Sequence, residues 1–538
     1  MRIKKRAGMG RKLFLMALAV VLLAAALPVT AGAAPMPSSG SLTIHKYALE
    51  DMDSVGLPND GNPAANIPSD AVPLAGVEFS VWQIDPVAVA AGSVTTRAQA
   101  WQNILPATEQ TGVTDANGEV IFSSLPQGLY YVAETANSGN TVSGAPFVVS
   151  VPMQDPAAAG SWITNVHAYP KNQPLAIDKF VGTSGTTDYY EVSKNLPVEF
   201  GEQFNWYIRT QLPADINPQH AEYYDISDTL RSYFDYQPGS VKIYILPASD
   251  SDLKNCPVLD QGDYTVNYDA ATNTLSAGLT AAGVTKVKSL VDAGSRYCVL
   301  AYGCVVNNTA PQGVALYSGA KLEYSRDTTG VSYNSGTQGA AFTLLSAKNN
   351  AGITMNANNA NKVTVEVTAQ PEVHTGKIGI TKLADGTNKL LSGAEFGIAK
   401  TKADAQAGSF IAAGTTDANG ELTFNGLKYG LPGDGPTKNS NNTTFWLAET
   451  KAPGGYKPMK DPVEVTFSYQ QDSDGTYYFA RVNVYNVKSG VSGETGTTPK
   501  TGDTSNLPLY LGIMALALAG SLTVLRIKRK KAADGTKQ

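Results

Sequence analysis

Between residues 40 and 490, apolar side chains occupy alternate positions in short runs, such as 42–46, 77–81 and 363–367. No long stretch shows the 3.6-residue period of an amphipathic helix. Glycine, asparagine, aspartate and proline separate the runs. Alternation of this kind predicts strands with one buried face, and many short strands with turns between them are typical of β-sandwiches. We therefore expect an all-β protein.

Three short segments recur in the same order. The pairs are 114–119 with 416–421 (TDANGE), 74–79 with 391–396 (LAGVEF and LSGAEF), and 132–135 with 447–450 (VAET and LAET). The repeat predicts two homologous immunoglobulin-like sandwiches at 34–172 and 373–490, with a longer sandwich at 173–372 between them. The Asp-Ala-Asn-Gly element is most simply a hairpin turn, because Asn and Gly accept positive φ; a calcium loop would need more oxygen ligands.

The chain begins with a basic stretch, an apolar run at 13–27 and the small residues Ala31-Gly32-Ala33. This order predicts a signal peptide at 1–33, cleaved after Ala33. The alternative is a buried helix or a retained anchor. Export implies an oxidising compartment, in which disulfides persist.

The C-terminal end has three parts after a linker at 491–497. Residues 498–502 read Thr498-Pro499-Lys500-Thr501-Gly502, residues 507–525 are uncharged and long enough to span a bilayer, and residues 526–531 form a basic tail. The alternative is an ordinary tail-anchored protein. In this order of parts the region 498–538 resembles the sorting signal of Gram-positive sortase substrates, with Thr498 in place of the usual Leu. The resemblance implies cleavage between Thr501 and Gly502.

The composition narrows the function further. The net charge is −5 and both termini are basic, so the part between them is more acidic still, which argues against nucleic-acid binding. Three cysteines and four scattered histidines predict no metal site, and no cofactor is expected. A disulfide between Cys256 and either Cys298 or Cys304 would leave one free thiol; whether it forms is left open.

Residues 162–171 resemble the WxxxVxVYPK motif of sortase-assembled pilins. Trp162, Val166, Tyr169, Pro170 and Lys171 match, and Ala168 replaces the second Val. The resemblance implies that the amine of Lys171 attacks the sortase thioester of another subunit and is joined to its Thr501. The alternative is an ordinary surface lysine at the end of a strand.

Lys382 shares a strand face with two isoleucines, and a buried ammonium must find a partner or lose its proton. The segment 445–456 resembles the YxLxETxAPxGY segment of collagen-adhesin B-type domains. The resemblance implies a spontaneous isopeptide bond between Lys382 and Asn486, assisted by Glu449. The alternative is a buried Lys–Glu ion pair.

The first sandwich repeats the pattern with Lys46, Glu134 and Asn172. The middle sandwich resembles the middle domain of backbone pilins, in which an Asp replaces the Glu, and Lys179 and Asp228 match. Where that family carries the bonding Asn, this chain has Ala369. Asn361 is the nearest substitute on the same face, so either Asn361 serves or this sandwich has no bond.

Together these resemblances identify the chain as similar to the major, or shaft, pilins of Gram-positive bacteria. They imply a structural subunit, not an enzyme, that forms a covalent homopolymer anchored to the cell wall and supports adhesion. The implied partners are identical subunits, pilin-specific and housekeeping sortases, tip and basal pilins, and peptidoglycan; the sequence names no host ligand. The alternatives are a wall-anchored adhesin or minor pilin that uses Thr501 only, and an exported enzyme, for which no cleft of converging polar residues can be assembled.

Overall fold

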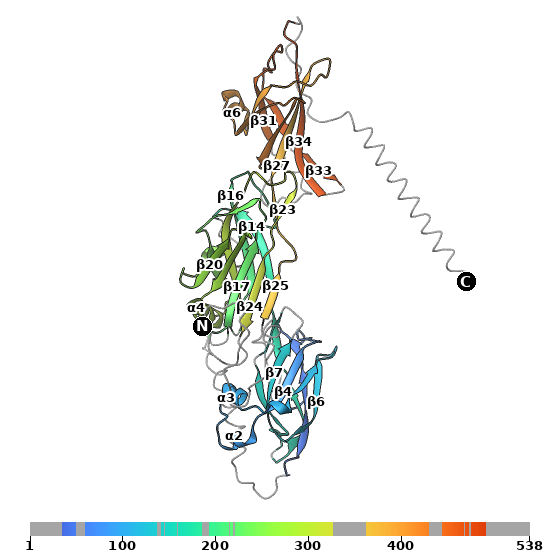
Figure 1. The fold of residues 1–538 in the computed structure, drawn as a ribbon, viewed down its shortest axis with the longest axis vertical. Coiled ribbons are helices and arrows are strands. Elements are labelled where there is room, and N and C mark those ends of the chain that lie inside the picture. Colours follow the sequence, from blue (N-terminus) through green and yellow to red (C-terminus); the bar gives the residue numbers. More distant parts are fainter. Residues whose placement is uncertain are drawn as a thin grey trace, which may run out of the picture. The chain divides into compact units, whose positions relative to one another are not determined.

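The computed structural model describes residues 35–49, 60–136, 141–144, 146–158, 160–185, 193–214, 216–218, 221–326, 362–429, 444–466, 468–472 and 475–490. The predicted signal peptide, the sorting signal and Asn361 lie outside these residues. Among the described helices, none has the length and apolar character needed to cross a bilayer. The chain forms two compact units: residues 1–194, 204–304 and 318–371 in unit one, and residues 195–203, 305–317 and 372–538 in unit two (Figure 1).

The first part of unit one is a set of short strands with two brief helices. Its elements are β1 (Ser39–His45), β2 (Tyr47–Ala48), β3 (Val72–Pro73), β4 (Glu78–Gln83), α2 (Pro86–Ala90), α3 (Arg97–Gln102), η1 (Pro106–Thr108), β5 (Gln110–Val113), β6 (Glu119–Pro126), β7 (Gly128–Ala136), β8 (Thr141–Val142), β9 (Phe147–Val151), β10 (Met153–Gln154), β11 (Trp162–Ile163), β12 (Asn165–Ala168) and β13 (Lys171–Pro174). They form sheets of order β12-β1-β6, β3-β2-β13-β8, β5-β4-β7-β9 and β10-β11.

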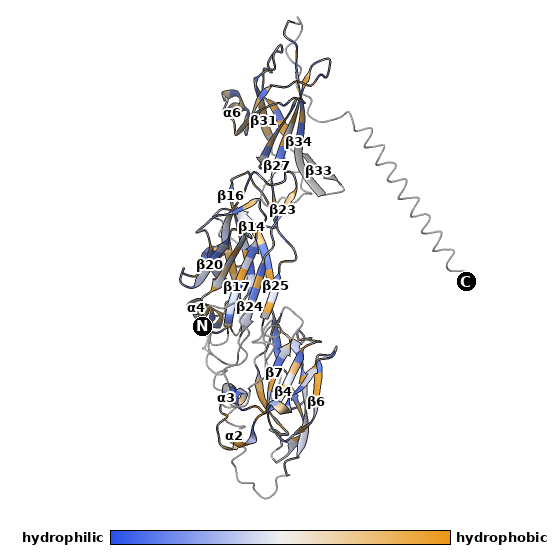
Figure 2. Ribbon diagram, in the orientation of Figure 1, coloured by the Kyte–Doolittle hydropathy of each residue, from blue (hydrophilic) through white to orange (hydrophobic). Residues whose placement is uncertain are grey.

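The predicted alternation explains how these sheets pack. Ile44 on β1 and Phe122 on β6 are buried in one core with Phe79 on β4 and Val132 on β7, so the β1 sheet and the β4 sheet face each other across a shared apolar layer. Figure 2 shows hydrophobic and hydrophilic residues interspersed along the strands. This is the pattern expected of strands with one buried and one solvated face.

The rest of the chain contains further sandwiches. The elements are β14 (Ile177–Thr183), β15 (Asn195–Pro197), β16 (Gln203–Gln211), β17 (Ala221–Thr229), β18 (Phe234–Tyr236), β19 (Lys242–Leu246), η3 (Leu253–Asn255), β20 (Tyr264–Asp269), β21 (Thr274–Leu279), α4 (Ala281–Asp292), β22 (Tyr297–Val306), β23 (Ala315–Tyr317), β24 (Lys321–Arg326), β25 (Lys362–Glu366), β26 (Glu372–His374), β27 (Gly376–Ala384), β28 (Glu395–Ala399), α6 (Lys402–Ala407), β29 (Ala412–Thr415), β30 (Glu421–Leu427), β31 (Thr444–Lys451), β32 (Val463–Thr466), β33 (Ser468–Asp472) and β34 (Gly475–Asn486).

In unit one, β14-β16-β22-β18 forms one sheet, with β19 also paired to β22, and β20-β21-β17-β24-β25 forms another. In unit two, β30-β27-β34-β33 packs on β29-β28-β31-β32 through a core that includes Ile380, Phe396, Leu447 and Val482. The expectation of an all-β fold built from sandwiches is confirmed.

The repeated Asp-Ala-Asn-Gly elements are turns, as predicted. The Asp115 carboxylate accepts the backbone N–H groups of Asn117 and Glu119, each at 2.9 Å, and Asp417 does the same at 2.8 Å for Asn419 and Glu421. The glycines that follow, Gly118 and Gly420, have φ of 74° and 70°. A side chain would be strained at this φ, which explains the glycine.

The disulfide left open by the sequence is not formed in this structure, where all three cysteines are unbridged thiols. Cys256 packs against a core cluster that includes Val299 and Ala301 of β22. Alternate residues of a strand point to opposite faces, so Cys298 and Cys304 lie on the other face of β22 from that contact. The sequence could not decide the pairing because it does not show which face of β22 the segment around Cys256 covers.

We predict that the denatured chain yields three titratable thiols without added reductant. In the folded chain only Cys256 should react, and slowly, because burial raises its pKa; burial raises the pKa of Cys298 to about 12. Reaction with a coloured thiol reagent, with and without denaturant, measures the number of reactive thiols per chain in the denatured and in the folded state. One thiol per denatured chain would mean that a disulfide does form.

Candidate functional site: buried lysines beside carboxylates and carboxamides

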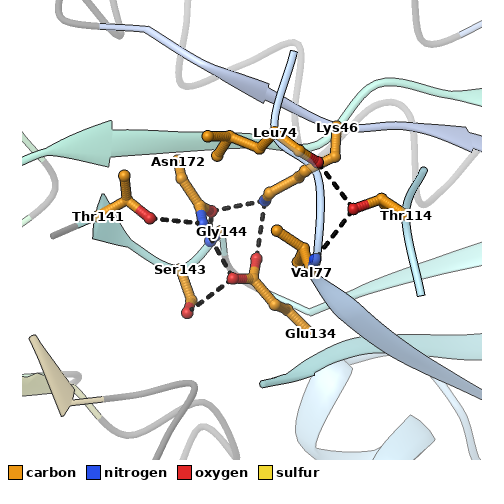
Figure 3. Close-up of polar contacts among 9 residues, drawn as sticks. All are labelled: Lys46, Leu74, Val77, Thr114, Glu134, Thr141, Ser143, Gly144 and Asn172. Carbon is orange, nitrogen blue, oxygen red and sulfur yellow. Dashed lines mark hydrogen bonds and ion pairs between the residues drawn. The ribbon is translucent and has the colours of Figure 1, made fainter. Parts of the chain in front are cut away.

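A buried lysine, a glutamate and an asparagine meet inside the first sandwich (Figure 3). Lys46 Nζ donates to Asn172 Oδ1 at 2.5 Å and lies 2.7 Å from Glu134 Oε2. Asn172 Nδ2 donates to Glu134 Oε1 at 2.9 Å, and Ser143 donates to the same oxygen at 3.1 Å. Lys46 and Asn172 are fully buried, and Glu134 is 4% exposed. The structure thus brings together the three residues that the sequence selected.

Strand pairing places Lys46 and Asn172 side by side. β2 and β13 run parallel, with Ala48 opposite Asn172. Asn172 is therefore two residues further along its strand than the residue level with Lys46, and it lies on the same face, because strand side chains repeat every two residues. Glu134 comes from β7 of another sheet and faces both. The first and last strands of this sandwich meet at this point.

The repeated sequence segments hold the backbone of Lys46. Its N–H donates to Gly118 O at 2.7 Å, and its carbonyl accepts Leu74 N–H at 3.0 Å. Thr114 joins these segments: its hydroxyl donates to Leu74 O at 2.7 Å and accepts Val77 N–H at 2.9 Å. A Cβ on Gly118 would stand 2.4 Å from Lys46 O, so the turn can approach the lysine this closely only with glycine.

Unit two contains the same arrangement. Lys382 Nζ contacts Asn486 Oδ1 and lies 3.2 Å from Glu449 Oε1. Asn486 Nδ2 donates to both Glu449 oxygens, at 2.9 and 3.0 Å. The side chains of Lys382 and Glu449 have no exposed surface. β27 and β34 run parallel with Ala384 opposite Asn486, which is the same two-residue offset as in the first sandwich.

The backbone support is also repeated. Lys382 N–H donates to Gly420 O at 2.7 Å, and Lys382 O accepts Leu391 N–H at 2.9 Å. Thr416 donates to Leu391 O at 3.0 Å and accepts Ala394 N–H at 3.0 Å. From the sequence these segments are predicted only as turns and strands. Their supporting role could have been suspected, because each recurs together with a lysine, but the hydrogen bonds that carry it are tertiary.

The environment of Lys382 makes its amine easier to deprotonate. Burial lowers the pKa of Lys382 to about 8, and the nearby Glu449 carboxylate partly offsets this shift. A neutral amine is a nucleophile, and here it lies against the carbonyl oxygen of a primary amide. The carboxyl group contacts both the amine and the amide nitrogen, which is the position required of a group that moves a proton between them.

The middle sandwich has a lysine and a carboxylate but a different third partner. Lys179 Nζ contacts Asp228, and both side chains are fully buried. Burial also lowers the pKa of Lys179, with Asp228 acting against the shift. Tyr302 and Ser318 both donate to Asp228, the latter at 2.7 Å. Sequence reasoning missed Tyr302 and Ser318, which lie on elements far from Asp228 in the chain; Asn361 lies outside the described residues.

Lys171 lies at the start of β13, directly before Asn172, and is half-buried. Its backbone pairs with Tyr47 of β2. Trp162 lies in β11 and Val166, which is fully buried, in β12. Tyr169 lies between β12 and β13, is 8% exposed, and its hydroxyl accepts Ala64 N–H at 2.6 Å. The motif therefore builds the local core that positions the lysine.

A pair of stacked histidines ties the motif strand to its neighbours. His45 Nε2 and His167 Nδ1 are 2.8 Å apart, and His45 Nδ1 lies 3.0 Å from Glu119 Oε1. Tyr169 stacks on His45 with ring centroids 4.7 Å apart. Burial and, secondarily, the charge of His45 lower the pKa of His167.

We predict that this pair makes unit one sensitive to acid. As pH falls below about 6.5, the unfolded chain takes up a proton at His167 more readily than the folded chain does, so stability is lost. His167→Gln should therefore show a smaller fall in melting temperature between pH 7 and pH 5 than the unaltered chain. The control His374→Gln, in unit two, should show the same fall as the unaltered chain. An equal fall in all three chains would exclude the pair as a source of acid sensitivity.

Comparison with known proteins agrees with the geometry. Residues 37–173 match the family described as Gram-positive pilin subunit D1, N-terminal domain, and residues 376–431 match a prealbumin-like fold domain. The chain is 27% identical to the fimbrial subunit type 2 of Actinomyces naeslundii over 91% of this chain and 90% of that protein. It is 29% identical to the fimbrial subunit type 1 of Actinomyces viscosus over 34% of this chain and 38% of that protein.

Solved structures share the fold. The full-length major pilin SpaD of Corynebacterium diphtheriae is similar with a TM-score of 0.55 and 23% identity, over 84% of this chain and 98% of that one. The major pilin SpaA of the same organism has a TM-score of 0.50 and 19% identity, over 84% and 100%. The relatives are structural subunits, not enzymes. In its N-terminal domain match, its fimbrial relative and its fold, the chain is thus similar to the fimbrial and pilin subunits of Gram-positive bacteria.

Proposed function

We propose that this chain is the shaft subunit of a covalent pilus, in which a sortase joins Thr501 of one subunit to Lys171 of the next. The observation that supports the proposal most directly is the position of Lys171. It lies next to Asn172, in a strand held to β2 and β8 and anchored by Val166 and Tyr169. The backbone of Lys171 is thus held at a defined place, which helps to position its amine for acyl transfer between large partners.

The sorting step transfers an acyl group. The Thr501 carbonyl, held as a thioester on the sortase cysteine, is attacked by the Lys171 amine; the new amide forms as the thiolate leaves. Anchoring of the finished polymer to peptidoglycan by a housekeeping sortase, with tip and basal pilins at its ends, follows from the same chemistry. A wall-anchored adhesin or minor pilin would use Thr501 without Lys171.

The internal clusters would form Lys–Asn bonds. In unit two, Lys382 Nζ attacks Asn486 Cγ; the C–N bond to the lysine forms, the bond to Asn486 Nδ2 breaks, and ammonia leaves with protons passed by Glu449. Lys46, Asn172 and Glu134 act likewise in the first sandwich. Each product is a neutral amide, so the cost of burying an ammonium disappears.

Such bonds would stiffen the subunit. Lys46 and Asn172 are 126 residues apart in sequence, and Lys382 and Asn486 are 104 apart. By analogy with disulfides, closing a loop of this length stabilises the fold by about 4–5 kcal/mol. The major pilin SpaA, whose fold this chain shares, has stabilising isopeptide bonds, which supports the same chemistry in these clusters.

We predict that the purified chain from residue 35 to residue 490 is about 34 Da lighter than its sequence mass, because two ammonia molecules have left. Glu134→Ala and Glu449→Ala should each restore about 17 Da, and Lys382→Ala should do the same. The matched control Lys377→Ala, five residues earlier on β27, should not. Intact-mass spectrometry decides; an unaltered mass in the parent chain would leave both clusters as ion pairs.

We predict that Lys171→Ala in the producing cell abolishes the high-mass ladder that denaturing gels show for a covalent polymer. Lys242→Ala, an exposed lysine on β19, should leave the ladder intact. A branched peptide containing Lys171 and Thr501 should appear in digests of native fibres. A ladder that survives the loss of Lys171 would favour another linkage lysine.

A further inference from the structure

The three clusters differ in which groups, besides the lysine, donate hydrogen bonds to the carboxylate. In the first sandwich Glu134 Oε1 accepts the Asn172 amide, with Ser143 on the same oxygen. In unit two Glu449 accepts the Asn486 amide. In the middle sandwich Asp228 Oδ2 accepts Lys179 and Tyr302, and Asp228 Oδ1 accepts the hydroxyl of Ser318 at 2.7 Å.

The acceptors of the lysine amine differ in the same way between the clusters. Lys46 and Lys382 each contact the oxygen of an Asn side chain. Lys179 instead donates to the backbone carbonyl of Gly319, at 3.3 Å, and its Nζ lies 4.2 Å from the centre of the Trp206 ring. Within the described part of the chain, no carboxamide contacts Lys179 or Asp228. The amine thus uses a backbone oxygen where the other two lysines have an acyl group to attack.

Ser318 lies beside both members of the pair. It is 2% exposed, it touches Asp228, and its neighbour Gly319 holds Lys179. A carboxamide carried on the Cβ of residue 318 would start beside the carboxylate, one residue from the carbonyl that holds the amine.

The two other candidate acceptors are Gln370 and Asn361. Gln370 lies near Gly319, since its Nε2 would be 3.2 Å from a Cβ there, but the residue is exposed and contacts neither Lys179 nor Asp228. On β25, the first described residue, Lys362, pairs with Ser325 near the end of β24 that is distal to Gly319. Asn361 itself lies outside the described residues.

We propose that Ser318 takes the place of a carboxamide beside Asp228, while Ala369 stands where the resembling pilins carry the bonding Asn, so that Lys179 and Asp228 remain a buried ion pair and this sandwich is the extensible segment of the subunit. A serine hydroxyl has no acyl carbon, so no amide can form with Lys179. The inference about extension rests on the proposed function, because it uses Lys171 and Thr501 as the points where force enters and leaves.

The path of force follows from the chain order. Between Lys171 and Thr501 lie only the middle sandwich and the sandwich of unit two; the first sandwich precedes Lys171 and is outside the path. In unit two a Lys382–Asn486 bond would join adjacent strands β27 and β34 and relieve the residues between them of load. The middle sandwich has no such bond, so its strands carry the load through hydrogen bonds and packing alone.

The first test is peptide mapping of the purified 35–490 chain. Lys179 should be found in a linear peptide, and the total loss should be about 34 Da. Ser318→Asn should add a third loss of about 17 Da and link Lys179 to residue 318. The matched controls Ser318→Ala, which removes the hydroxyl without adding an acyl group, and the double variant Ser318→Asn with Asp228→Ala should add none.

Three results would overturn the inference: a cross-link at Lys179 in the parent chain, whether to Gln370 or to another residue; a third loss in Ser318→Ala; or no third loss in Ser318→Asn while that chain still resists protease in the middle sandwich. If Ser318→Asn does not fold, the parent chain decides alone, through the state of Lys179. These masses are measured on single chains and do not depend on polymerisation. A wrong mass prediction would therefore not argue against the Lys171–Thr501 linkage. Loss of that linkage would not change the masses.

The second test is mechanical. A single chain held at residues 171 and 490 and pulled should show one unfolding event that releases on the order of 600–700 Å, the extended length of about 200 residues less the folded span. The Ser318→Asn chain, once linked, should lose most of that extension. A parent chain without any unfolding event would contradict the proposed extensibility.

Discussion

The structure depends on the burial of a lysine ammonium group inside each sandwich. An isolated charge there would cost several kcal/mol, so each lysine is surrounded by groups that neutralise it: Glu134 for Lys46, Asp228 for Lys179 and Glu449 for Lys382. The carboxylate is as deeply buried as the amine. Burial lowers the pKa of Lys382 and of Lys179, so these amines lose a proton more easily than an exposed lysine does.

The fold brings the partners together through the pairing of the first strand with the last. In unit two β27 and β34 are parallel neighbours over eight residue pairs, and the asparagine follows the lysine's own partner by two positions. The first sandwich has the same offset between β2 and β13. A bond at this point closes almost the entire sandwich, which is why one amide could resist force applied at its ends.

The repeated segments explain why two sandwiches with different cores make the same cluster. The Thr-Asp-Ala-Asn-Gly turn and the strand that begins near Leu74 or Leu391 both hydrogen-bond to the lysine backbone. The lysine is thus held at both its N–H and its carbonyl before its side chain meets the carboxylate. The middle sandwich lacks these sequence segments, and its lysine lies on a strand in an antiparallel pair, β14 with β16. In the middle sandwich, a serine contacts the carboxylate where the other clusters have a carboxamide, and the backbone around the lysine is also held differently.

The amino-acid sequence by itself determined the all-β class and the repeat, because alternating polarity and turn residues are local features. The residues of the two complete clusters were selected through the resemblance to collagen-adhesin B-type domains. Tertiary structure decided the contacts between segments that are far apart in the chain. It placed Ser318 and Tyr302 on Asp228, showed that the repeated turns hold the lysines, and kept Cys256 on the opposite face of β22 from Cys298 and Cys304. The physical reason is that strand pairing and the packing of one sheet on another set these contacts, and neither is encoded in any single stretch of the chain.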